Sequence, residues 1–152
     1  MSDFVIPSLE MHRRALKDIG IELAASADVI DKVASGSTSA VATLSGAFAA
    51  QNRPNELDDH SLESVLRCFA EAYAEAWEIS FNVDDGGADL VFGECAIRDI
   101  CRDAGEELGG SLCALFHGFM VGYLHQLVEG MKRGRFTIEM VEGECRIRID
   151  VA

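Results

Sequence analysis

Two stretches of the chain space their apolar residues as buried helices do. From Ser61 onward, apolar residues recur every three or four positions, which predicts an amphipathic helix whose apolar stripe belongs to the core. From Ser111 to about Glu129 nearly every residue is apolar, which predicts a central helix. Polar residues such as His117 interrupt this helix, so we do not expect it to span a membrane. The stripe of the first helix consists of Leu62, Val65, Leu66, Phe69, Tyr73 and Trp77.

Two other stretches alternate apolar and polar residues, as half-buried strands do. Residues 79–83 alternate up to the turn-forming run 84–87, and an extended apolar run resumes at 90–92. Residues 136–141 and 145–151 alternate in the same way on either side of a glycine. Each pair of runs predicts a β-hairpin.

Shorter helical signals complete the pattern. Residues 9–20 predict a first helix, and residues 21–51 predict two more helices that a flexible loop at 35–39 separates. Residues 98–107 predict a short helix that the glycines at 109–110 end. The expected fold class is therefore α+β, with helices packed on an antiparallel sheet made of two β-hairpins.

Length and composition bound the domain organisation. A chain of 152 residues, 49% of them apolar, is expected to form one domain with one core. We divide this single domain, 1–152, into an N-terminal helical segment, 1–60, and a ligand-binding core, 61–152.

Charge and cysteine content narrow the range of partners. A net charge of −13 repels phosphate backbones and anionic lipid, so neither nucleic acid nor a membrane is expected as a partner. Five cysteines is an odd number, and no leading segment resembles a signal peptide, so reduced thiols and a cytoplasmic location are expected. Cys68 and Cys101 occupy apolar helix positions and are expected in the core.

The last hairpin carries an acid and a thiol that could share a face. A two-residue turn at Gly143-Glu144 would make Glu142 and Cys145 cross-strand partners. Strand alternation then directs both side chains inward, where a carboxylate beside a thiol is costly unless a cation binds it. The alternative is that Glu142 turns to solvent at the hairpin tip.

The central helix carries two further signals. Cys113 and His117 lie four residues apart, so they share a face on which a thiolate and an imidazole can hold one ion. A buried, hydrogen-bonded histidine and an inert cysteine are the alternative. Gly110, Ala114, Gly118 and Gly122 form a small-residue stripe, which either another backbone or a flat ligand could fill; helix packing is the favoured interpretation.

These motifs resemble a known family. The order E-C-A-I-R-D, then L-C-A-L-F-H-G-F-M-V-G-Y, then an acid-x-x-Cys hairpin is similar to the 4-vinyl reductase domain family of predicted small-molecule-binding modules. The resemblance covers about the last 60 residues, with Ala96 where the family commonly has proline. It implies helices on a sheet of two hairpins around an apolar channel, as in vesicle-tethering complex subunits.

The resemblance also implies a set of zinc ligands. In the related sensor domains of phenol- and xylene-responsive activators, an aromatic effector lies in a buried pocket beside a structural zinc. The matching positions here are Cys113, Glu142 and Cys145, and the family's fourth cysteine would fall just beyond Ala152. His117 or Cys95 would then have to supply the fourth ligand.

Three functions remain open. The favoured function is a non-catalytic binding or sensor module for a hydrophobic or aromatic small molecule. Its expected pocket residues are Phe116, Gly118, Met120, Gly122, Tyr123 and Trp77. The first alternative is a zinc or iron–sulfur sensor built on Cys95, Cys113 and Cys145 with His117 or Glu142. The second alternative is a structural homodimeric subunit. An enzyme is disfavoured because no nucleophile–base pair or cofactor fingerprint appears.

Overall fold

The computed structural model describes residues 29–51, 53, 57–131 and 135–151, and the single positions 18, 22 and 26. The helix expected at 9–20 therefore lies outside the described residues, apart from residue 18. The described elements are, in chain order, α2 (Ser37–Gln51), α3 (Leu62–Ala72), β1 (Trp77–Asp84), β2 (Gly87–Cys95), α4 (Ala96–Ala104), α5 (Ser111–Leu127), β3 (Arg135–Val141) and β4 (Glu144–Asp150).

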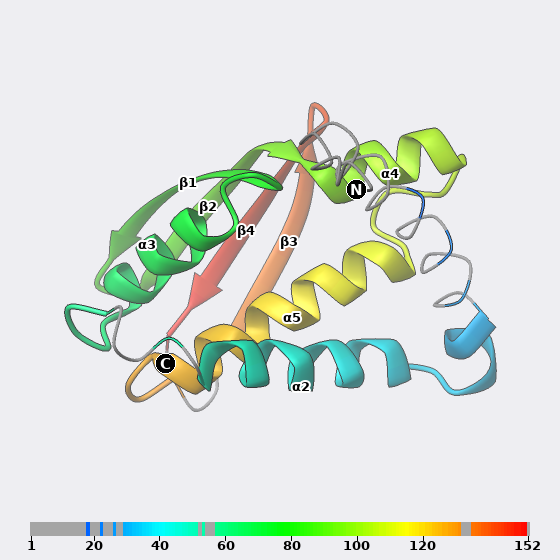
Figure 1. Cartoon of the computed structure of the whole chain (residues 1–152). Coiled ribbons are helices and arrows are strands. Elements are labelled where there is room, and N and C mark those ends of the chain that lie inside the picture. Colours follow the sequence, from blue (N-terminus) through cyan, green and yellow to red (C-terminus); the bar gives the residue numbers. More distant parts are fainter. Residues whose placement is uncertain are drawn as a thin grey trace, which may run out of the picture.

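The four strands form one antiparallel sheet in the order β1-β2-β4-β3. Both predicted hairpins are present, and the α+β fold of helices packed on this sheet is confirmed (Figure 1). The inner face of the sheet carries the alternating apolar residues, of which Leu90, Phe92, Ile147 and Ile149 are almost fully buried. The outer face carries polar residues, among them Arg148, which pairs with Asp84, Asp89 and Asp150.

α3 begins where the sequence predicts but ends earlier. The Ser61 hydroxyl caps the helix by accepting the Ser64 N–H at 3.2 Å, and Tyr73 is the C-terminal cap. Trp77, which the helical spacing assigned to this helix, is instead the first residue of β1. Trp77 fits both periods, four residues after Tyr73 and two before Ile79, and the strand alternation is the one that the structure follows.

α5 is the centre of the molecule, between the sheet and α2 (Figure 1). α2 and α5 run side by side in the same direction, with their backbones in close contact. A Cβ atom added at Gly122 would lie 1.9 Å from the Thr43 carbonyl oxygen, and one added at Gly46 would lie 1.9 Å from that of Phe119. The favoured interpretation of the glycine stripe, close packing against another helix, is confirmed for Gly118 and Gly122, whereas Gly110 lies against the Glu107 carbonyl group instead.

α4 is shorter than predicted. Gly105 takes the left-handed conformation at φ 70°, and its N–H and that of Glu106 bond to the last carbonyls of the helix. The helix therefore stops at Ala104, and the prediction that it runs to Glu107 is wrong. A glycine in this conformation ends a helix at little cost, so the first suitable glycine is used rather than the pair at 109–110.

No helix in these described ranges is both long and apolar enough to cross a membrane.

Candidate functional site

The predicted chemistry gathers in a small cavity where α4 and α5 meet the β3–β4 hairpin. We call it the thiol pocket. Its free volume is about 40 Å³. The lining comes from the end of β2, from α4, from the loop before α5, from the first half of α5, and from β3 and β4. The lining residues are Phe92, Cys95, Ile97, Arg98, Leu108, Gly109, Cys113, Phe116, His117, Ile138, Met140 and Cys145.

Four of the five predicted metal ligands lie in this pocket. Cys95 ends β2, Cys113 and His117 lie one turn apart on α5, and Cys145 lies on β4. The Cys145 Sγ is 3.8 Å from the His117 Nε2, and the Cys113 Sγ accepts the Gly109 N–H at 3.3 Å. These four side chains therefore line one pocket, and their role as metal ligands stays a prediction.

Cys101 extends the group of thiols beyond the predicted set. It lies on α4 with 1% of its surface exposed, as the expected core position requires, and the nearby Cys113 contributes to the raised pKa of its thiol. A small apolar cluster built around Cys101 and Leu112 joins α4 to α5 beside the pocket. The thiol group is therefore shared between the pocket and the packing of α4.

Burial keeps the side chains of Cys145, Cys101 and His117 uncharged. It raises the pKa of the Cys145 thiol to about 11, and the neighbouring Cys95 and Cys113 thiols act in the same direction. Burial also raises the pKa of Cys101 to about 11, with a further contribution from Cys113. Burial lowers the pKa of His117 to about 4. At neutral pH the Cys145 and Cys101 thiols are therefore protonated and the His117 imidazole is uncharged, as burial among apolar residues favours.

Arg98 lines the pocket and hydrogen-bonds to two backbone carbonyl groups. It was not predicted as a site residue from the sequence. Its guanidinium donates to the Gly143 carbonyl at the hairpin tip at 2.7 Å and to the Gly93 carbonyl of β2. One α4 side chain thus holds both the hairpin tip and the end of β2. The only sequence signal for it is its place in the E-C-A-I-R-D motif, three residues after Cys95.

Glu142 does not belong to the site. Val141 pairs with Glu144 and Met140 with Cys145, so the two turn residues are Glu142 and Gly143 rather than Gly143 and Glu144. Glu142 has φ 52° and is exposed at the tip of the hairpin. The prediction that Glu142 and Cys145 are inward-facing partners is wrong. Moving a two-residue turn by one position shifts the pairing and takes the carboxylate off the strand.

The six predicted ligand-pocket residues do not lie together in one pocket. Phe116 lines the thiol pocket. Met120 and Tyr123 are fully buried in the main core, and Gly118 and Gly122 face α2 at backbone distances, so no room for a ligand remains at these four positions. Trp77 stacks on Phe116 with ring centroids 4.2 Å apart but is not part of the pocket lining.

In the described residues, the thiols and the side chains near them are not arranged as a complete metal site. Within the ranges that the structure covers, no three His, Cys, Asp or Glu side chains come close enough to hold one ion together. The nearest arrangement is the pair of Cys145 and His117. Other side chains would have to rotate or move before a complete coordination shell could form.

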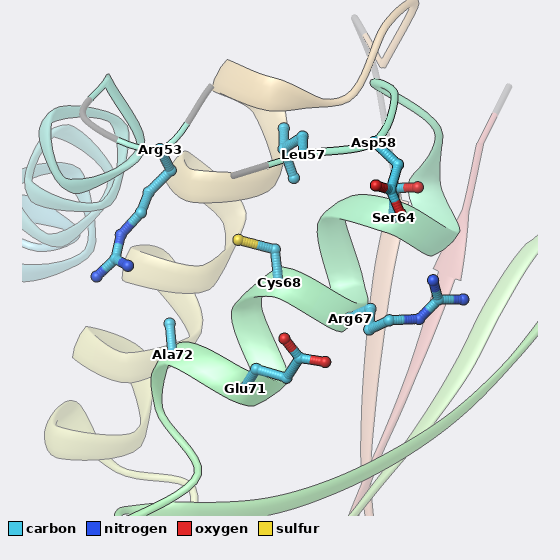
Figure 2. A pocket seen from close by; sticks show the side chains of 8 residues that line it. All are labelled: Arg53, Leu57, Asp58, Ser64, Arg67, Cys68, Glu71 and Ala72. Carbon is cyan, nitrogen blue, oxygen red and sulfur yellow. The ribbon is translucent and has the colours of Figure 1, made fainter. Parts of the chain in front are cut away.

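A second, larger cavity lies over α3, and Figure 2 shows it from close by. This α3 groove has a volume of about 400 Å³, and its lining residues are Arg53, Leu57, Asp58, Ser64, Arg67, Cys68, Glu71 and Ala72. The Cys68 Sγ is 3.5 Å from the Tyr123 Oη, and Arg67 pairs with Glu63 at 2.8 Å. Cys68, which was predicted to lie in the core, is half-buried and lines this groove together with Arg53 and Leu57. No short-range pattern in the sequence brings these residues together.

Comparisons with known proteins return no match. No family model fits the chain, and neither a curated protein nor a solved structure is found to be similar to it. The resemblance to the 4-vinyl reductase domain family therefore stays a prediction.

Proposed function

We propose that the protein is a non-catalytic module that binds a small apolar or aromatic molecule in the thiol pocket. The observation that carries this proposal is the apolar mouth of the pocket. Leu108, Ile138 and Met140 are 41%, 42% and 43% exposed, although core packing normally buries such side chains. Large apolar residues exposed around an apolar concavity are typical of a ligand site.

The lining chemistry supports the same class of ligand. Phe92 and Phe116 meet edge to face at 5.5 Å, which offers an aromatic surface inside the pocket. The Cys145 thiol and the His117 ring are uncharged at neutral pH, so they do not demand a charged ligand. The α3 groove is larger, but its charged lining suits a polar molecule instead.

The small free volume implies that ligand entry moves side chains. About 40 Å³ accommodates about one water-sized group, whereas an apolar cavity that holds benzene measures about 150 Å³. Leu108 and Met140 lie at the mouth, and an unbranched methionine side chain repacks at low cost. We therefore expect the ligand to displace these two side chains toward solvent.

Binding without catalysis fits the state of the thiols. A cysteine nucleophile reacts as the thiolate, and the raised pKa of Cys145 and of Cys101 keeps both thiols protonated near neutral pH. Five free cysteines also fit a reducing compartment, which supports the expected cytoplasmic location.

The test is a titration of the full chain with toluene and with naphthalene, followed by calorimetry and by the shift in melting temperature. Ile138→Arg places a charge at the apolar mouth and should weaken binding by at least about tenfold. Thr137→Arg is the matched control, because Thr137 is exposed on the opposite face of the same strand and should leave binding unchanged. Equal losses in both variants, or no binding by the parent, would refute the proposal.

A thiolate zinc site is the second candidate, and one distance favours it. Tetrahedral zinc bonded to one sulfur and one nitrogen holds these atoms about 3.6 Å apart, close to the 3.8 Å between Cys145 Sγ and His117 Nε2. Zinc titration with a competing chelator tests this candidate. Stoichiometric binding that Cys145→Ser and Cys113→Ser each abolish would support it, and binding that both variants retain would exclude these ligands.

A further inference from the structure

α2 presents an apolar surface on the side that faces away from α5. Val41, Leu44 and Phe48 are 61%, 62% and 65% exposed and follow one another at the three- and four-residue spacing of a single helix face. In the described part of the chain, the only other exposed large apolar residues lie at the mouth of the thiol pocket or at positions 29–33. Neither the thiol pocket nor the α3 groove is lined by residues of this face, so neither cavity explains it.

We propose that this α2 face is the surface through which two copies of the chain associate. A helix that is apolar on all sides is normally covered on all sides. α5 covers one side of α2 through Gly46 and Ala42, whose small side chains allow the close approach. The opposite side therefore calls for a second covering surface.

Charge favours a second copy as that surface. The chain has a net charge of −13, so two copies repel each other across most of their surfaces. No Asp, Glu, Lys or Arg occurs from position 33 to position 52, and α2 lies wholly within this uncharged run. A contact centred on α2 therefore brings two acidic molecules together without placing like charges in the interface.

The order of side chains on the face fits twofold symmetry. In a symmetric dimer the same patch is used twice, so it must be complementary to itself. An antiparallel pairing of two α2 helices around positions 44 and 45 places Phe48 of each copy against Val41 of the other. This pairing sets a large side chain against a smaller one, and the two copies of Leu44 lie close to the axis.

The test measures the mass of the full chain in solution by light scattering and sedimentation at several micromolar concentrations. The parent should have twice the chain mass of 16.5 kDa, and Leu44→Glu should have the single-chain mass. Ile138→Glu is the matched control, since it puts the same charge on an apolar residue at the pocket mouth and should stay dimeric. A parent that is monomeric at every concentration, or a loss of the dimer only in Ile138→Glu, would overturn the proposal.

Mixing two variants distinguishes a second copy from another partner and from a folding defect. Leu44→Glu and Leu44→Lys should each be monomeric with the circular dichroism spectrum of the parent. Because position 44 meets its own copy near the axis, an equimolar mixture should recover the two-chain mass. A mixture that stays monomeric while both variants are folded would contradict the pairing of α2 with itself.

Discussion

The two sides of α5 are built by opposite means. The side toward α2 uses glycines, and the helix backbones approach so closely that Cβ atoms at Gly118 and Gly122 would meet Ser39 and Thr43. The side toward the sheet uses large aromatic residues, with Phe116 between Trp77 and Phe92. The thiol pocket lies at the sheet side, at the end of the helix where thiols take the place of larger apolar residues.

This contrast teaches where a ligand can enter. In the sequence, a stripe of glycines suggests a groove on the helix surface. In the structure, α2 fills this groove at Gly118 and Gly122. The thiol pocket exists because side chains of unequal size meet at the junction of several elements, where close packing is hardest to complete. The side of α5 that the glycines mark is therefore structural, and the side that the cysteines mark is the candidate for function.

The largest expected loss of stability comes from adding a methyl group to a glycine of α5 that faces α2. Gly122→Ala should lower the free energy of unfolding by at least about 3 kcal/mol, because its Cβ would lie 1.9 Å from the Thr43 carbonyl oxygen and must push the helices apart. Gly118→Ala should cost less, about 1–2 kcal/mol, because its nearest contact is 2.9 Å from the Ser39 carbonyl oxygen. Chemical denaturation of both variants measures this order. The reverse order would mean that the two helices are not in this contact.

An intermediate loss of stability is expected at low pH, and it comes from His117 on the side of α5 that faces the sheet. Burial lowers the pKa of His117 from 6.5 to about 4. Between these two pH values the imidazole is therefore protonated in the unfolded chain and neutral in the folded chain. Stability is therefore complete above pH 6.5 and is lost as the pH falls toward 4. Between about pH 7 and about pH 5 this costs about 2 kcal/mol.

His117→Gln provides the comparison for this pH effect. The variant should lose about 2 kcal/mol less than the parent over the same pH interval, because its side chain does not titrate. Denaturation at both pH values, with a chelator present so that no metal holds the ring, gives the difference. Parallel pH profiles for parent and variant would show that the imidazole is hydrated in the folded protein.

The sequence predicted the two hairpins and the helices α3 and α5, and it placed several of the thiol-pocket side chains on the faces where the structure has them. Periodicity depends on burial of one face, so the strands, α3 and α5 could be predicted, and with them the inward positions of Cys113, His117 and Cys145. Glu142 was misplaced because its position depends on the turn. Both turns that contain Gly143 are plausible, and the one adopted places Glu142 itself at positive φ. Arg98 was missed because its partners are carbonyl groups distant in sequence.

The smallest change in stability is expected for Trp77→Phe, on the side of α5 that faces the sheet. The Trp77 Nε1 is buried and has no hydrogen-bond partner among the described residues. A buried unpaired N–H costs about 1–3 kcal/mol, and phenylalanine retains the stacking on Phe116 while removing this donor. Trp77→Phe should therefore stay within about 1 kcal/mol of the parent despite its smaller ring, whereas Trp77→Ala should lose about 3 kcal/mol or more. Thermal denaturation of both variants separates the cost of the unpaired indole N–H from the loss of ring packing. A loss in Trp77→Phe as large as in Trp77→Ala would mean that the indole N–H has a partner, such as a bound water, and that this side of α5 is as fully satisfied as the side that packs on α2.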